Sequence, residues 1–86
     1  MEENTLAPCH QARWEKIQDD GSVRYYQARI IQDLLGDWTV FCSWGRKEYA
    51  GGGSKTLLAS NQQEAVDTLQ LTHRKRLARG YVPVLV

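Results

Sequence analysis

The sequence predicts a small α+β domain, in which an antiparallel sheet of three to four strands has one C-terminal helix packed on one face. Three segments separated by turn signals, 13–17, 24–32 and 37–43, have the composition of strands. The second and third of them alternate apolar and polar residues with a period of two, as a sheet with one drier face requires. Residues 60–79 then repeat apolar side chains at helical spacing and stop at a glycine.

The length and composition fit one domain with a packed core. The chain has 86 residues, of which 42% are hydrophobic and 24% charged. We expect a flexible leader over residues 1–11 and a single domain over residues 12–86 that includes the apolar C-terminal tail. No secretory signal and no run long enough to cross a membrane is seen, so a cytoplasmic location is expected. Cys9 and Cys42 lack metal-ligand spacing, and we expect free thiols, with Cys42 buried, and no metal or cofactor.

The third strand carries the residues on which a functional interpretation depends. Its alternation places Trp38, Val40, Cys42 and Trp44 on one face. This pattern favours a core position for Trp44. A loop over residues 47–54 with three consecutive glycines follows, and residues 55–59 are predicted to be a short fourth strand.

The helix has clear start and stop signals. Ser60 is predicted to be the N-cap, with Gln63 completing a capping box, and the helix is expected to end at about Arg79 before Gly80. Its predicted inward stripe consists of Val66, Leu69, His73 and Leu77, flanked by Ala65. The apolar tail, residues 81–86, is expected to pack over the sheet or along an edge strand, because Pro83 cannot donate to a central ladder.

Charge is divided unevenly along the chain, although the net charge is only +1. Residues 1–37 carry seven acids and four bases, whereas residues 38–86 carry seven bases and three acids. Local potential matters more to an anionic ligand than total charge does, so the second half is the better candidate for binding one.

The tripeptide Trp44-Gly45-Arg46 lies in this basic half, at the end of the third strand. Tryptophan offers a flat stacking face, and arginine offers a fork of donors suited to phosphate. Glycine between them keeps bulk away from a bound partner.

The order of elements, the aromatic second strand beginning Arg24-Tyr25-Tyr26, and a third strand that ends in this tripeptide resemble the WGR domain. The resemblance covers about residues 12–82 and is to the stand-alone bacterial type. Related domains occur in poly(ADP-ribose) polymerases and in molybdate-metabolism-regulator-like proteins. The resemblance to this family implies that Trp44 packs on the sugar of a terminal nucleotide and that Arg46 links DNA to neighbouring domains. Glu48 and Tyr49 stand where the family commonly has a short glycine-containing turn, and the polymerases' catalytic domain is not in this sequence.

From the residues and the resemblance together, we expect a non-catalytic domain that binds DNA ends or the phosphate backbone. The predicted nucleic-acid-binding residues are Trp44, Gly45, Arg46, Lys47, Lys55, Arg74 and Lys75. Each has an alternative interpretation: a core indole for Trp44, solvated surface charge for Arg46 and Lys47, and stabilisation of the helix dipole for the cations of the last helical turn. His73 is interpreted as a core histidine.

An enzyme is not predicted. The segment from Gly51 to Thr56 lacks the glycine directly before lysine that a Walker A loop needs, and a strand follows it in place of a helix. The alternative function is a protein-interaction module, or a self-associating one, that uses the same surface with Leu71 and the apolar tail. A third, weaker alternative is a sensor of a small anion such as molybdate.

Overall fold

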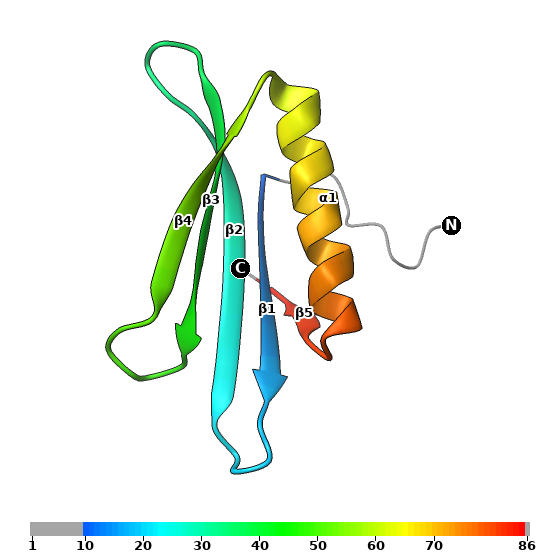
Figure 1. Ribbon diagram of the computed structural model, residues 1–86. Helices are drawn as coiled ribbons and strands as arrows, with labels where there is room; N and C mark the ends of the chain where they lie inside the picture. The colour runs from blue at the N-terminus through cyan, green and yellow to red at the C-terminus, as the bar shows by residue number, and fades with distance from the viewer. Residues whose placement is uncertain (1–9, 86) are drawn as a thin grey trace.

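A computed structural model describes residues 10–85 and shows one five-stranded antiparallel sheet with one helix on one face (Figure 1). Residues 1–9, most of the predicted leader, lie outside the described residues, as does Val86. The elements are β1 Gln11–Ile17, β2 Val23–Gln32, β3 Trp38–Arg46, β4 Gly53–Ala59, α1 Gln62–Ala78 and β5 Val82–Val84. No helix among residues 10–85 is long and apolar enough to cross a membrane.

The sheet has the strand order β4-β3-β2-β1-β5. The predicted number of strands, three to four, is therefore wrong, because the apolar tail supplies a fifth. Val82–Val84 pairs antiparallel with β1, and Pro83 lies opposite Trp14. The expectation that the tail packs along an edge strand is confirmed, and an edge position is where a residue without an N–H donor is tolerated.

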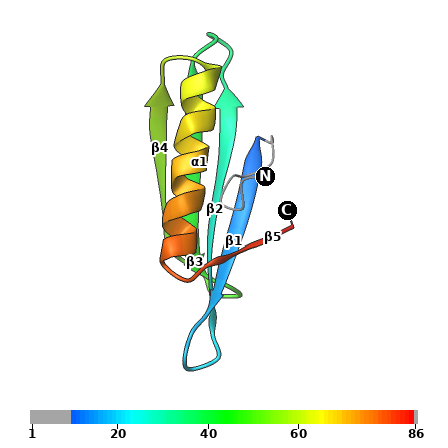
Figure 2. The same ribbon diagram turned by 90° about the vertical axis from the view of Figure 1, so that its right-hand side faces the viewer.

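The core lies between α1 and the sheet face that it covers (Figure 2). The alternation seen in the sequence sets this face: Trp14, Tyr26 and Trp44 are aligned across β1, β2 and β3, and Gly53 continues the row on β4. Val40 and Cys42 are fully buried, and Cys42 is a free thiol, as predicted. From the helix, Ala65, Leu69 and His73 are buried against them.

The helix begins one residue later than the sequence predicts. The N-cap is Asn61, not Ser60: its side chain accepts a 2.8 Å hydrogen bond from the backbone N–H of Glu64. The Glu64 carboxylate in turn accepts the N–H of Ser60 at 2.8 Å. Asparagine and serine cap equally well, and the extended backbone of Asn61 places its own side chain over the first turn.

The end of the helix is where the sequence places it. Gly80 has φ of +89°, and its N–H donates to the carbonyl of Leu77 while the N–H of Tyr81 donates to that of Arg76. This pair of bonds is a Schellman motif. It reverses the chain and brings Tyr81 back beside Arg76.

Candidate nucleic-acid interface

Trp44 is both part of the core boundary and part of a surface. It is half-buried in β3, and its indole stacks on the phenol ring of Tyr26 with 5.7 Å between ring centroids and 10° between planes. The sequence left a core position and a ligand platform as alternatives. The structure shows an indole packed against the core that also lines an open pocket.

The glycine opposite Trp44 makes room for the indole. A Cβ at Gly53 would lie 2.6 Å from the Cε2 and Cζ2 atoms of Trp44, closer than any stable contact allows. The indole therefore lies between the Tyr26 ring and the Gly53 backbone. One glycine of the run 51–53 thus has a steric role that no local pattern in the sequence indicated.

The pocket beside Trp44, which we call the Trp44 groove, has a volume of about 330 Å³. Its lining residues come from β2, β3, β4, α1 and the turn after α1, and they are Arg24, Tyr25, Tyr26, Trp44, Gly45, Lys55, Arg76, Arg79 and Tyr81. Four of them are cations and none is an acid. This combination of aromatic rings and uncompensated positive charge is suited to a phosphate next to a base or sugar.

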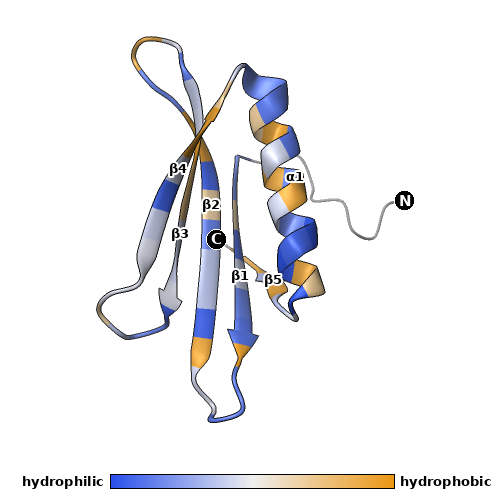
Figure 3. Ribbon diagram, in the orientation of Figure 1, coloured by the Kyte–Doolittle hydropathy of each residue, from blue (hydrophilic) through white to orange (hydrophobic). Residues whose placement is uncertain are grey.

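The register of the sheet explains why cations and rings meet here. The row Trp14–Tyr26–Trp44 is followed, two residues along on the same face, by Lys16–Arg24–Arg46. The two rows are about 7 Å apart by strand geometry. Figure 3 shows a hydrophilic stretch near the C-terminal end of α1, followed by an apolar band in its last turn, and hydrophilic segments of β1 and β2 near the same end of the sheet.

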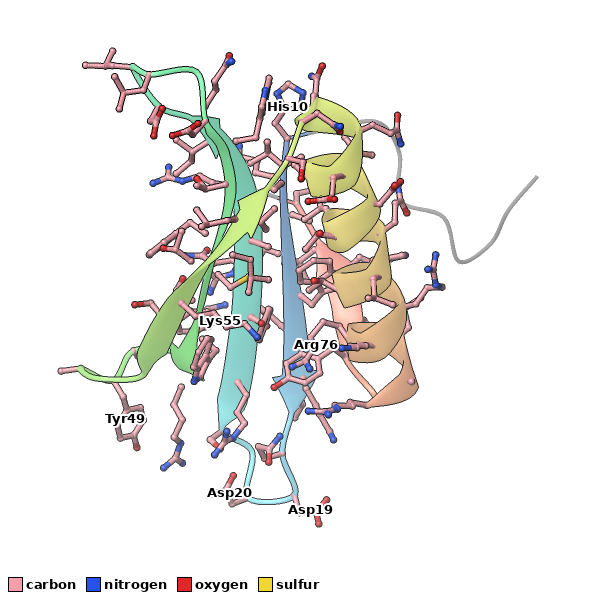
Figure 4. The ribbon with its side chains drawn as sticks, turned by 45° about the horizontal axis from the view of Figure 1, so that its top comes forward. His10, Asp19, Asp20, Tyr49, Lys55 and Arg76 are labelled. Atoms are coloured by element: carbon pink, nitrogen blue, oxygen red, sulfur yellow. The ribbon has the colours of Figure 1, made fainter. Side chains whose placement is uncertain are left out.

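Arg76 reaches into the groove from the helix. Its Cζ atom lies 4.2 Å from the centre of the Tyr26 ring and 5.3 Å from that of Tyr81. Its Nε atom is buried and has no hydrogen-bond partner within residues 10–85. Figure 4 shows Lys55 of β4 and Arg76 of α1 extending toward the same space over β2 from its two sides.

Of the predicted site residues, Trp44, Gly45 and Lys55 are brought together in the groove. A side chain at position 45 would point to the sheet face opposite Trp44, where its Cβ would lie 3.2 Å from the Tyr25 hydroxyl. Arg74 and Lys75 are exposed on the helix and do not line the groove.

Arg46 and Lys47 do not line the groove, and each pairs with an acid. Arg46 is 3.5 Å from the Asp20 carboxylate and stacks over Tyr49 at 4.6 Å. Lys47 lies 3.6 Å from the Glu15 carboxylate. Hydrogen bonds from Ser22 lower the pKa of Asp20, and the charge of Arg46 lowers it further. The Arg46–Asp20 pair is solvent-exposed and easily exchanged for another anion, whereas the Glu15 carboxylate of the second pair is more buried and also pairs with Arg13.

Three groove cations, Arg24, Arg76 and Arg79, were not predicted as site residues. Helical periodicity would place Arg79 on the side opposite the inward stripe, but Arg79 is the C-cap, where helical geometry ends. Arg24 has a signal in the sequence, since it directly precedes the aromatic pair of the second strand. The position of Arg76 depends on how the helix sits on the sheet and has no local signal.

His73 lies in the core, as its place in the inward stripe predicts, and the structure supplies the partner that the sequence did not. Its Nδ1 atom accepts a 3.0 Å hydrogen bond from Nε1 of Trp14. Burial lowers the pKa of His73, and the nearby charge of Arg74 lowers it further. In the part of the chain that the structure describes, no group of three or more His, Cys, Asp or Glu side chains is placed to hold a metal ion.

The family model of the WGR domain matches residues 10–85, nearly the whole chain. A search of curated proteins found no match. WGR domains are generally small nucleic-acid-binding modules that are not catalytic by themselves.

Proposed function

The chain belongs to the WGR domain family, and we propose that it binds DNA through the Trp44 groove, with phosphates on the groove cations and a terminal sugar or base against the indole. The observation that carries the proposal is the composition of the groove: four cations from separate segments, aromatic walls and no carboxylate. Arg46, at the end of the same strand, adds a further cation once a phosphate replaces its carboxylate partner Asp20.

The near-neutral net charge does not oppose this function, because no acid lines the groove, and Asp20 and Glu15 are paired with Arg46 and Lys47. Asp19 and Asp20 are at the tip of the β1–β2 hairpin, as Figure 4 shows. Glu64 and Asp67 are in the first half of α1, whereas the groove is at its C-terminal end. An approaching polyanion therefore meets a local positive field.

Fluorescence anisotropy with labelled DNA tests the proposal. We expect a blunt duplex, the same duplex with 5′-phosphates and a single strand to bind with an affinity that falls steeply as salt rises. Engagement of three to four phosphates gives a log–log slope of about −3 to −4 on duplex DNA. Absence of binding at about 50 mM salt, or an affinity that does not depend on salt, would contradict the proposal. Equal affinity for all three probes would support binding to the phosphate backbone and contradict recognition of DNA ends.

A protein-interaction function is the second candidate, and exposed apolar side chains favour it. Leu71 on α1 is 47% exposed, Leu58 on the edge strand β4 is 82% exposed, and Leu85 after β5 is 98% exposed. If these residues form an interface between copies, light scattering after size exclusion gives a dimer mass that Leu58→Ser or Leu71→Ser reduces to the monomer. A monomer mass at all concentrations would contradict self-association.

A further inference from the structure

We propose that Arg76 is the residue that fixes a phosphate in the Trp44 groove, and that two tyrosine rings hold its guanidinium in place of a carboxylate. The ligand group is a phosphodiester, whose paired oxygens match the planar donor fork of arginine. This inference rests on the proposed function and assigns the central role to a residue outside the tripeptide.

Among the described residues, Arg13, Arg46 and Arg76 stack on tyrosine rings, and the first two also pair with a carboxylate. Arg13 lies over Tyr25 at 4.7 Å and also pairs with the Glu15 carboxylate at 3.1 Å. Arg46 lies over Tyr49 and likewise forms an ion pair with the Asp20 carboxylate. Arg76 contacts the rings of Tyr26 and Tyr81, but within residues 10–85 it forms no ion pair. Its positive charge therefore has no paired carboxylate among the described residues.

The position of Arg76 carries a desolvation cost. Its Nε atom is buried and has no hydrogen-bond acceptor among residues 10–85, and a buried donor that has lost water and gained no partner is unfavourable. Cation–π contacts offset part of this cost and fix the plane of the guanidinium. A phosphate in the groove supplies the missing counter-charge and accepts from the terminal nitrogens.

The residues around Arg76 in the groove also favour an anion. Arg24, Lys55 and Arg79 line the same 330 Å³ space, and their like charges favour entry of an anion. Lys16 is already engaged, since its Nζ donates to the carbonyl of Arg79 at 2.8 Å at the helix C-terminus. Arg76 differs from the other groove cations in being held by rings on β2 and after α1, so less entropy is lost when it binds.

The contacts also link the phosphate position to the indole. Tyr26 is contacted by the Arg76 guanidinium and by the Trp44 ring. A phosphate held by Arg76 therefore lies close to a sugar or base that packs on Trp44. Arg76→Lys keeps the charge but loses the fork and most of the stacking, so it separates this role from simple electrostatic attraction.

The test measures binding of a fluorescein-labelled 12-nucleotide single strand and a blunt 12-base-pair duplex to the full chain. We expect Arg76→Lys to weaken binding at least tenfold with an almost unchanged salt slope, and Arg76→Gln to weaken it further and reduce the duplex slope by about 0.9. Arg74→Lys and Arg74→Gln are the matched controls, because Arg74 is on the same helix, exposed and outside the groove. We expect their affinities to stay within twofold of the wild type.

A further variant removes one ring without changing charge. Tyr81→Leu should weaken binding about fivefold with the salt slope unchanged, and it remains informative if Arg76 variants melt below the assay temperature. Binding by Arg76→Lys equal to the wild type, or an equal loss in Arg74→Gln, would overturn the role of Arg76 and leave the proposed function intact. Failure of the wild type to bind either probe would overturn both.

Discussion

The indole Nε1 of Trp14 donates a 3.0 Å hydrogen bond to Nδ1 of His73 and joins β1 to α1 inside the core. Trp14 is fully buried and His73 is 4% exposed, so each polar atom depends on the other for its partner. Because Nδ1 accepts, the folded state requires a neutral imidazole with its proton on Nε2.

This bond makes stability depend on pH. Burial lowers the pKa of His73 in the folded protein, whereas an unfolded histidine titrates near 6.5. The unfolded chain therefore binds more protons below about pH 6.5, and the free energy of unfolding should fall there by at most about 1.4 kcal/mol per pH unit. Urea denaturation at pH 7.5, 6.5 and 5.5 measures this.

His73→Gln should flatten that pH dependence, because a glutamine oxygen can accept from Trp14 and does not titrate. His10→Gln is the control, since His10 is exposed and far from this bond, and it should retain the slope of the wild type. A slope that survives in His73→Gln would assign the pH dependence to another group.

Trp44→Ala should affect both stability and binding, because the indole stacks on Tyr26 and lines the groove. We expect a loss of roughly 1–3 kcal/mol in unfolding free energy. A loss of about 1–3 kcal/mol in binding free energy is also expected for a variant that remains folded at the assay temperature. Trp38→Ala is the matched control: it lies on the same strand and face, about 20 Å away, and should lower stability while leaving affinity unchanged. Equal effects of both variants on affinity would place the binding surface elsewhere.

Gly53→Ala tests the space that the indole occupies. The added Cβ would collide with Trp44, so the ring must move away from β4. We expect a loss of about 1–3 kcal/mol in stability and a shift in tryptophan fluorescence, with weaker DNA binding. Ser54→Ala, at the next and exposed position, should change none of these. Unchanged fluorescence in Gly53→Ala would show that the indole does not lie over this glycine.

Asn61→Ala distinguishes the observed helix cap from the one that the sequence predicts. It removes the acceptor for the N–H of Glu64 and should cost about 1 kcal/mol in thermal or urea denaturation. Ser60→Ala should cost much less, because Ser60 donates its backbone N–H to the Glu64 carboxylate and this bond does not need the serine side chain. A larger effect at Ser60 would restore it as the N-cap.

The sequence by itself determined which faces of the strands and the helix are buried, and where the helix ends. Alternation placed Trp44 with Val40 and Cys42, and periodicity placed Leu69 and His73 on the buried side of the helix. Gly80 marked the helix end. These features are local: each depends on the repeat of a strand or helix or on the backbone freedom of one residue, which a single segment reveals.

Tertiary structure alone decided which segments meet. The fifth strand, the position of Gly53 opposite Trp44 and the contacts of Arg76 with Tyr26 and Tyr81 all join residues distant in sequence or separated by a turn. Strand register and the seating of the helix depend on how the whole core packs, not on the period of any one segment. The Trp-Gly-Arg motif could thus be found in the sequence, whereas the cationic groove beside it exists only once α1 lies across the sheet.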